Sequence, residues 1–532
     1  MKRRDFIKVA AAGSMAGSGL LAAPALALTA EDKVLKFVPQ ANLANLDPIW
    51  GTQYVVRNAS MLIWDQLYGI DSTLTPKPQM AEGAVTSDDH KTWTITLRDG
   101  LKWHDGEKVT SKDCAASLKR WMVRDTMGQL IKAQLNEIAT PDDKTIVIKM
   151  SKPFPKMLFA IGKANSPVAM MMPERLANTD PFKQIAEYIG SGPMKFAKNE
   201  WVPGSMAVFE RFDGYVPRAE AADWSSGGKR MLFDRIEWQI LPDPATAAAA
   251  LQNGEIDWWE TPIPDVIPLL KRNRNVVVDI ADPLGNIGSF RMNHLFPPFD
   301  NVKIRQAVQV ALNQQDYMQA VVGDDPAMWK LCPSFFTPGT PLYTEAGADR
   351  LKGPRNIELA KKMLAEAGYK GEKVKLVVAT DIAITKAEGD VSADLLQKIG
   401  MNVDYVATDW GTVGTIRAKK DPPDQGGWNI FHTWHAGADC VNPAPYTAIV
   451  ATGGTAWFGW PKSDAVTAGI AEWYDAPDLP AEKAAIDKVN AAAMEDVVYI
   501  PTGFFLMNQA WRKNVSGVVK APFPVFWGVQ KT

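Results

Sequence analysis

Histidines and tryptophans are the residues of this sequence whose types and spacing could support chemistry. The chain has only five histidines, and His432 and His435 form the one close pair. Two imidazoles can share a metal ion only if they face the same side, but on a strand residues three apart point to opposite faces. The pair therefore predicts polar contacts in a pocket or on the surface, and we expect no metal site and no cofactor.

Sequence motifs that mark catalytic sites are missing. The chain has no G-x-S-x-G, H-E-x-x-H, C-x-x-C, P-loop or G-x-G-x-x-G motif. His104 and Asp105 could form an acid–base pair, but Asp99-Gly100 and Asp105-Gly106 are typical of turns, and Thr110–Asp113 predicts the capped start of a helix. We therefore expect that the protein is not an enzyme.

Tryptophan is unusually abundant, with 19 residues in the chain. Large flat rings give much contact area at little cost in rotamer entropy, which suits a pocket that closes over a ligand, although such rings also fill cores. Polar neighbours, including His435, Asp439 and Asn442, favour a pocket position for Trp434. Five tryptophans gather towards the C-terminal third, namely Trp410, Trp428, Trp434, Trp457 and Trp460.

Strands and helices alternate along the chain and must position these residues. Residues 92–98 place Trp93, Ile95 and Leu97 on one face, which predicts a half-buried strand. Apolar residues recur at helical spacing in residues 304–312, behind the capping candidates Asp300 and Asn301.

Two further helices are each followed by a strand. The first runs from Ile357 to Ala367 between Asn356 and Gly368 and precedes a strand at 374–378. The second covers about 391–399, ends at Gly400 and precedes a strand at 402–407. This order predicts α/β units with parallel strands in the C-terminal half. Segments 283–298 and 333–341, rich in Pro and Gly, are predicted to be connectors.

Length and charge restrict the class of protein. A chain of 532 residues exceeds what one hydrophobic core usually organises, so two or more lobes are expected. The 58 basic and 60 acidic residues give a net charge of -2, which argues against a nucleic-acid partner. After residue 28 no apolar stretch is long enough to span a bilayer.

The N-terminus has the features of an export signal. Arg3 and Arg4 precede a weakly apolar stretch from Val9 to Leu21, and Ala25-Leu26-Ala27 fits a cleavage site. Residues 1–27 are therefore predicted to be a twin-arginine signal peptide that is removed after Ala27, leaving the protein in the periplasm. The three cysteines leave two alternatives open, either a Cys332–Cys440 bridge or three buried thiols.

Ten short motifs occur in one consistent order along the mature chain and resemble those of the family 5 extracellular solute-binding proteins. This family includes the dipeptide-, oligopeptide- and nickel-binding receptors of ABC importers. Residues 93–120 carry the most specific part of the resemblance. The motifs are Leu46–Pro48, Trp64–Gly69, Pro76–Ala81, Trp93–Arg120, Gly190–Pro193, Gly214-Tyr215, Leu251–Asp257, Met292-Asn293, Val302–Asn313 and Ala360–Gly368.

The resemblance implies an α/β, bilobed periplasmic binding protein-like fold of type II, in its large form with an additional subdomain and with hinged lobes around a ligand cleft. Lobe I is expected to comprise residues 28–58, 188–284 and 503–532, and lobe II residues 285–502. Residues 59–187 are expected to form the additional subdomain of lobe I.

The resemblance also implies a small-molecule ligand, an ABC permease complex in the inner membrane as partner, and a monomer. Trp410 and Trp434 match pocket tryptophans of the dipeptide receptors. The family's ammonium-binding aspartate would fall near Ala436 or Gly437, where none is present, and Asp439 is the alternative. Its carboxylate-binding arginine would fall within 379–385, a stretch that contains Asp381 instead. Peptide-like compounds, opines, oligosaccharides and metal chelates remain alternatives, as does a hydrolase on the same scaffold. The expected ligand-binding residues are Trp410, Trp434, His435, Asp439, Asp381 and Asn293.

Overall fold

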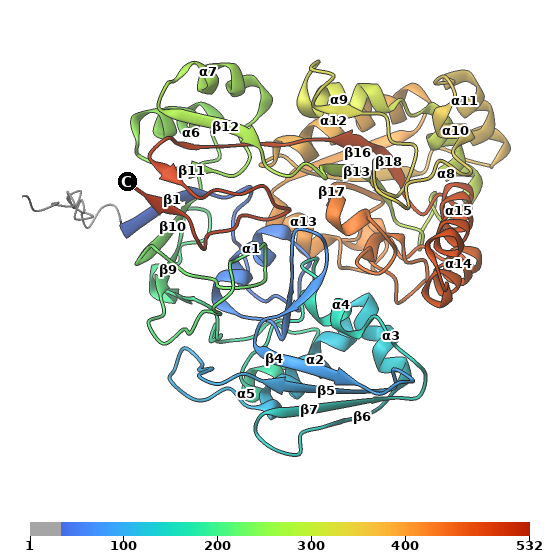
Figure 1. Ribbon diagram of the computed structural model, residues 1–532. Helices are drawn as coiled ribbons and strands as arrows, with labels where there is room; N and C mark the ends of the chain where they lie inside the picture. The colour runs from blue at the N-terminus through green and yellow to red at the C-terminus, as the bar shows by residue number, and fades with distance from the viewer. Residues whose placement is uncertain (1–32) are drawn as a thin grey trace, which may run out of the picture.

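The computed structural model describes residues 33–532, so the predicted signal peptide, residues 1–27, lies outside the described residues. Three sheets dominate the fold (Figure 1). The seven-stranded sheet has the order β12-β19-β11-β1-β10-β9-β8, in which β1 runs parallel to β10 and β11. Its strands are β1 (Val34–Val38), β8 (Met194–Phe196), β9 (Met206–Arg211), β10 (Arg235–Gln239), β11 (Trp258–Trp259), β12 (Val276–Ile280) and β19 (Asn508–Arg512).

The six-stranded sheet is built almost entirely from the C-terminal half of the chain. Its order is β14-β18-β13-β17-β15-β16, and β15 pairs in parallel with both β16 and β17. The strands are β13 (Asn286–Met292), β14 (Trp329–Lys330), β15 (Lys373–Ala379), β16 (Asn402–Thr408), β17 (Ile430–Ala436) and β18 (Ile500–Phe505). The helices of this half are α8 (Val302–Ala311), α9 (Gln314–Val322), α10 (Asp349–Lys352), α11 (Ile357–Glu366), α12 (Ala383–Lys398), α13 (Trp410–Ile416), α14 (Asp464–Asp475) and α15 (Leu479–Asp496).

A four-stranded antiparallel sheet with the order β4-β5-β7-β6 forms the lower part of Figure 1. Its strands are β4 (Ala81–Thr86), β5 (Thr92–Leu97), β6 (Leu135–Ala139) and β7 (Thr145–Met150), with α2 (Ser111–Arg124) and α3 (Thr126–Gln134) between β5 and β6. The remaining elements are α1 (Tyr54–Ile63), β2 (Tyr68–Ile70), β3 (Pro76–Pro78), α4 (Met157–Gly162), α5 (Glu174–Ala177), α6 (Pro244–Asn253), α7 (Ile267–Arg272), β20 (Val515–Ser516) and β21 (Gln530–Lys531).

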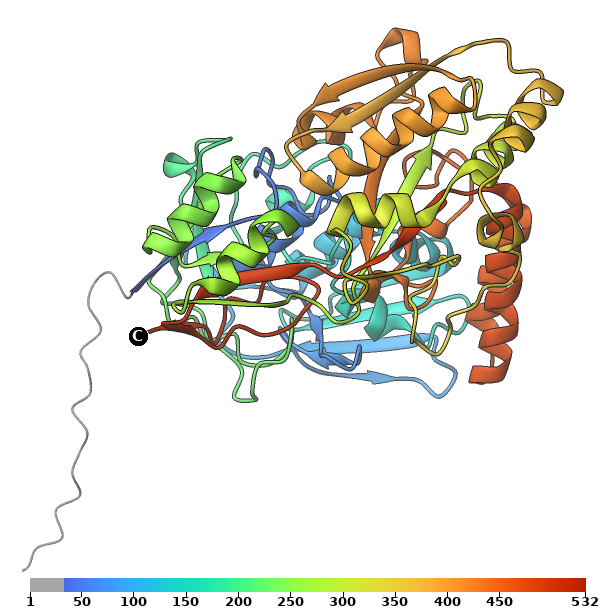
Figure 2. The same ribbon diagram turned by 90° about the horizontal axis from the view of Figure 1, so that it is seen from above.

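The chain passes twice between the seven-stranded and the six-stranded sheet. Residues 281–285 join β12 to β13, and Leu506 and Met507 join β18 to β19. Residues 503–505, assigned above to lobe I, pair with β13 in the six-stranded sheet. In the view from above, α6 and α7 lie at the opposite end of the molecule from α14 and α15 (Figure 2). The lobe boundaries themselves remain a prediction.

Elements with clear periodicity form as expected. Strand β5 alternates buried and half-buried residues, α8 begins after the N-cap Asn301, and α11 begins after the N-cap Asn356. The capping box of Thr110 and Asp113 is present at the start of α2. Helix α12 begins at Ala383, earlier than the expected start near residue 391. The predicted parallel pairing of β15 and β16 is confirmed.

The prediction that residues 283–298 form a connector is wrong. Residues 286–292 are β13, a fully buried strand between β17 and β18. Because both faces of this strand are covered, its sequence shows no alternation of polar and apolar residues. A glycine is required at position 288 because two side chains lie close to its Cα. A Cβ there would meet Thr502 Oγ1 at 2.0 Å and Glu388 Oε1 at 2.3 Å.

The three cysteines are free thiols in the structure, and all of them are buried. The alternative of three buried thiols therefore describes this structure, and the Cys332–Cys440 bridge does not. Burial raises the pKa of the Cys332 thiol to about 12, so that it stays protonated near neutral pH. Within residues 33–532 no helix combines the length and the apolar character needed to cross a bilayer.

Candidate ligand-binding site

A large cavity of about 600 Å³ lies where strands of the two main sheets end. Residues after β1, β10 and β11 line it from the seven-stranded sheet, and residues after β15 line it from the six-stranded sheet. Ligands in α/β folds commonly bind outside the carboxyl ends of parallel strands, where loops diverge. The segments are 38–42, 240–242, 259–264 and 380–384, with Leu506–Asn508 from the second crossing.

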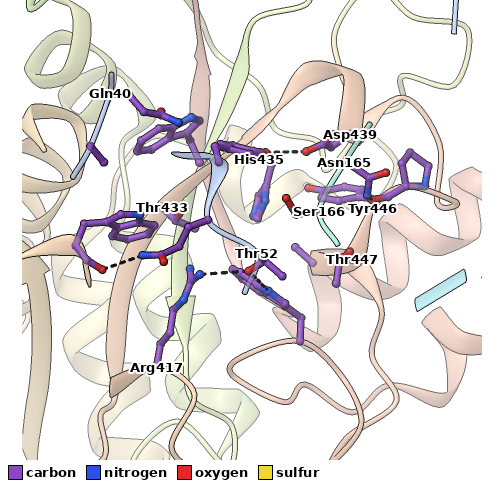
Figure 3. A pocket seen from close by; sticks show the side chains of 18 of the residues that line it. Gln40, Thr52, Asn165, Ser166, Arg417, Thr433, His435, Asp439, Tyr446 and Thr447 are labelled. Atoms are coloured by element: carbon purple, nitrogen blue, oxygen red, sulfur yellow. Dashed lines mark hydrogen bonds between the residues drawn. The ribbon is translucent and has the colours of Figure 1, made fainter. Parts of the chain in front are cut away.

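A smaller cavity of about 50 Å³ adjoins the large one. The two share Gln40, Ala41, Ile382 and Trp434 in their linings. Together they form the continuous feature that we call the cleft. Figure 3 shows side chains from segments far apart in the sequence around the small cavity, among them Thr52, Asn165, Arg417, Thr433, His435, Asp439 and Tyr446.

The beginning of α1 bonds to the six-stranded half at the small cavity. The Tyr54 hydroxyl donates to Asp439 Oδ2 at 2.7 Å and accepts from the Ala436 amide at 2.8 Å. Gln53 Nε2 donates to the carbonyl of Trp410 at 3.2 Å. These contacts join residues more than 350 positions apart, so the cavity is assembled only by the complete fold.

Four of the six expected ligand-binding residues line the small cavity, namely Trp410, Trp434, His435 and Asp439. Asp381 lines the large cavity, and its Oδ1 accepts a hydrogen bond from the Trp410 amide at 2.9 Å, which positions the start of α13. Asn293 lies elsewhere. Its amide donates to the Trp428 carbonyl and accepts from the Leu295 amide, so its side chain organises a loop and lines none of the three described cavities.

The two histidines of β17 lie in different environments, as their spacing on a strand requires. His432 lies 2.8 Å from the Ser392 hydroxyl and packs edge-on against Phe290, whereas His435 lines the small cavity. The pKa of both imidazoles is lowered to about 3, by burial alone for His432 and by burial together with Arg291 and Arg417 for His435. His435 is therefore neutral near pH 7.

The tryptophan cluster divides between cleft and core. Trp457 joins Trp410 and Trp434 in the lining of the small cavity. Trp428 and Trp460 instead pack against each other, with ring centroids 6.0 Å apart. Sequence reasoning missed Trp457 as a cavity residue, because its spacing does not distinguish it from Trp460.

Sequence reasoning also missed Arg417, Tyr54 and Asn165, which line the same cavity. Arg417 follows the last residue of α13, where a basic residue ordinarily interacts with helix carbonyls at the surface. Here it is buried, and burial lowers its pKa to about 9. Tyr54 and Asn165 carry no local signal, because their partners lie 385 and 280 residues away.

Comparison with known proteins agrees with this architecture. Residues 75–457 match the model of the bacterial extracellular solute-binding proteins, family 5 Middle. The chain belongs to this family. It is 35% identical over 540 residues, covering 100% of this chain and 99% of the relative, to the probable peptide ABC transporter periplasmic-binding protein y4tO of Sinorhizobium fredii. It is 26% identical over 411 residues, or 72% of each chain, to the dipeptide-binding protein DppE of Bacillus subtilis.

Solved structures place this solute-binding protein in the same fold. The oligopeptide-binding protein AppA of Bacillus subtilis, in complex with a nonapeptide, superimposes with a TM-score of 0.77 at 18% identity, over 94% of this chain and 99% of that chain. The protein AgaA from A.tumefacien R10, in complex with agropinic acid, gives a TM-score of 0.77 at 20% identity over the same shares. The α/β periplasmic binding protein-like fold is thereby confirmed.

Proposed function

We propose that this solute-binding protein is the substrate-binding component of an ABC importer. It holds a small organic solute in the cleft between its two halves and delivers it to a permease complex in the inner membrane. One observation carries the proposal: a cavity of about 600 Å³ is lined from both main sheets, next to a small polar cavity. That volume lies within the range of about 300–1,000 Å³ that is usual for small-molecule sites.

The two chain segments that cross between the sheets supply a mechanism for opening and closing the cleft. Segments 281–285 and 506-507 can act as hinges, because a few backbone torsions there reorient one sheet against the other. A solute that contacts both sides binds the closed arrangement more tightly than the open one and so shifts the population towards closure. Release follows when the permease favours the open arrangement.

The relatives support an organic solute of peptide-like or opine-like size. One relative is a probable peptide receptor, and the structural neighbours hold a nonapeptide and agropinic acid. A hydrolase on the same scaffold is less well supported, because an imidazole with a pKa of about 3, as in His435, is a weak general base near pH 7. We therefore propose a binding protein that releases its ligand unaltered.

We further propose that the protein acts as a monomer in the periplasm after export by the twin-arginine route. The family relative is a periplasmic-binding protein, which supports the compartment. The arginine pair Arg3-Arg4 and the Ala25-Leu26-Ala27 site support the route. Sequencing the N-terminus of the periplasmic protein tests the removal of the signal peptide, with residue 28 as the expected first residue.

Native mass spectrometry of the protein purified from its own periplasm tests the receptor function. The expected spectrum contains the mature protein with one retained small molecule, which is released with unchanged mass on unfolding. A chemically altered product of the retained compound would instead indicate an enzyme, and a protein that retains and binds no organic solute would contradict the proposal.

Replacing Trp434 with Leu tests whether the cleft is where the solute binds. Trp434 lines both cavities, so its loss should weaken binding of the retained solute about tenfold or more, equivalent to about 1.4 kcal/mol. The melting temperature of the ligand-free protein should change little. Trp473→Leu is the matched control, since Trp473 is similarly buried in α14 and its Nε1 also lacks a partner. Trp473→Leu should lower the melting temperature and leave the affinity for the solute unchanged. If Trp434→Leu also lowers the melting temperature of the ligand-free protein and leaves the affinity unchanged, Trp434 belongs to the core.

A further inference from the structure

Arg417 is a buried cation without an anionic partner. Its side chain is 4% exposed, and its Nη2 makes a single hydrogen bond, to Thr52 Oγ1 at 3.2 Å, while its Nε has no partner. Within residues 33–532 no carboxylate forms an ion pair with it, and burial alone accounts for the lowering of its pKa. Leaving a charged group unpaired in a desolvated site is unfavourable, so such an arrangement calls for a binding partner.

Comparison with the other buried arginines shows that the lack of partners at Arg417 is unusual. Arg120 forms a salt bridge with Asp47 at 2.8 Å. Arg291 and Arg305 have no carboxylate, but each donates to several backbone carbonyls that lie around its guanidinium. Arg57 also forms no salt bridge, but it donates to the Pro522 carbonyl and to Asn58 Oδ1. Arg417 has neither a carboxylate nor a carbonyl, and it is the arginine that lines the small cavity.

Aromatic rings fix the guanidinium of Arg417 in place. Its Cζ lies 5.0 Å from the ring centroid of Trp410, 5.4 Å from that of Trp457 and 4.8 Å from that of Phe458. Cation–π contacts act on the faces of the planar guanidinium and leave its N–H groups available at the edge. A rigid, charged donor fork of this kind matches the geometry of a carboxylate.

Other hydrogen-bonding groups at the same cavity also lack partners. Trp434 Nε1, Thr447 Oγ1 and His435 Nε2 are buried and unpartnered, and each can donate. Asn165 Oδ1 is also unpartnered and can only accept, whereas Thr447 Oγ1 and, in one tautomer, His435 Nε2 can accept as well as donate. Buried polar groups without partners are rare in folded proteins, so several donors around one cavity indicate a ligand group that accepts hydrogen bonds.

We infer that the small cavity beside Arg417 is a subsite for a carboxylate of the solute, whose apolar body occupies the adjoining large cavity. A volume of about 50 Å³ holds roughly three to five water-sized groups, enough for a carboxylate and little more. The large cavity is lined chiefly by prolines and aliphatic side chains, and Trp434 and Ile382 border both cavities. The inference rests on the proposed function and narrows its substrate class to organic acids.

Acetate is the probe that tests the subsite, with acetamide as its uncharged isostere. Acetate should raise the melting temperature of the mature protein saturably, beyond the effect of acetamide or of chloride at matched ionic strength. Arg417→Gln should weaken the apparent acetate affinity at least about tenfold, whereas Arg417→Lys should keep part of it. Arg355→Gln, which removes a partly exposed arginine paired with Asp316, should leave the acetate response unchanged.

The ligand-free variants provide a second measurement. Because Arg417→Gln removes an unpaired buried charge, its melting temperature should equal or exceed that of the wild type. Equal acetate responses in wild type and Arg417→Gln, or no response in the wild type, would overturn the subsite. These outcomes are independent of the receptor proposal. A protein that retains a neutral solute but does not respond to acetate would contradict only the carboxylate subsite. A protein that responds to acetate but binds no organic solute would contradict the receptor function.

Discussion

Burial keeps four of the five imidazoles of this protein in their neutral form near pH 7. Desolvation lowers the pKa of His104 to about 4 and those of His432 and His435 to about 3, and it lowers the pKa of His294 well below its ordinary value. His435 therefore contributes to the cleft as a neutral hydrogen-bonding group across the whole physiological range. Ligand binding should not depend on its titration between pH 6 and pH 8.

The buried imidazoles predict how stability depends on pH. An imidazole whose pKa is lower in the folded than in the unfolded state contributes stability that is present above about pH 6.5 and is lost as the pH falls towards its folded pKa. For His432 that window runs from about 6.5 to about 3, with a slope of up to about 1.4 kcal/mol per pH unit. Urea unfolding at pH 7.5, 6.5 and 5.5 should therefore show that the free energy of unfolding falls less steeply, or rises more steeply, towards acid pH in His432→Gln than in the wild type.

The exposed His90 supplies the control for this series, since His90→Gln should leave the slope as in the wild type. Parallel slopes for the wild type and His432→Gln would contradict the prediction.

Residues of the cleft could be found from the sequence where they lie together in the chain. Trp434, His435 and Asp439 share one strand end, and their types alone indicated a polar, aromatic site. Arg417 could not be identified, because nothing in its neighbourhood shows that a residue at the end of α13 is buried without a partner. The ligand class suggested by the structure depends on that one missed residue.

At the scale of elements, a buried ion pair attaches the region of the four-stranded sheet to the rest of the fold. Arg120 on α2 contacts both carboxylate oxygens of Asp47, at 3.0 Å and 2.8 Å, and both side chains are fully buried. Asp47 also accepts hydrogen bonds from the amides of Ile49 and Ile185. One carboxylate thus joins α2 to two loops, the one before α1 and the one before β8.

Asp47→Asn should be strongly destabilising, because it leaves the charge of Arg120 buried without a counter-ion. Breaking a buried pair by removing one partner typically costs about 3–5 kcal/mol. The control is Glu137→Gln, which breaks the exposed pair of Glu137 with Lys149 and should cost at most about 1 kcal/mol. Equilibrium denaturation of the wild type, Asp47→Asn and Glu137→Gln measures the loss in the free energy of unfolding for each variant. A loss for Asp47→Asn as small as that for Glu137→Gln would show that solvent reaches Arg120.

The elements that the sequence predicted well are those that carry polar and apolar residues on opposite faces. Helix α11 exposes one face to water and strand β5 has one half-buried face, whereas α8 is buried from Ile304 to Ala311 but keeps its apolar residues at helical spacing. Strand β13 has no exposed face, and the Pro- and Gly-rich residues around it are typical of loops, so it was mistaken for a connector. One of the two central strands of the six-stranded sheet was therefore not recognisable from the sequence.

At the scale of the whole molecule, hydrogen bonds from residues at the start of α1 cross the cleft and join its two sides. Tyr54 links Asp439 and the Ala436 amide, and Thr52 Oγ1 accepts from Arg417 and from Trp457 Nε1. Burial, and then the charge of Asp439, raise the pKa of the Tyr54 hydroxyl well above its ordinary value, so it remains a donor at physiological pH. In the proposed hinge motion these bonds break when the two halves separate, and water then hydrates the same groups.

Replacing Tyr54 with Phe should therefore shift the protein towards the open arrangement. In the closed form the variant leaves Asp439 Oδ2 and the Ala436 amide without their partner, whereas water satisfies both when the halves separate. A loss of about 1–1.5 kcal/mol of closure predicts a five- to tenfold rise in the Kd for the retained solute. Small-angle scattering should show a larger radius of gyration for the ligand-free variant than for the ligand-free wild type. Tyr343→Phe, which removes only a local bond to Glu345, should change neither quantity. If Tyr54→Phe also leaves both the radius and the Kd unchanged, the bond does not hold the halves together, and closure must depend on the solute alone.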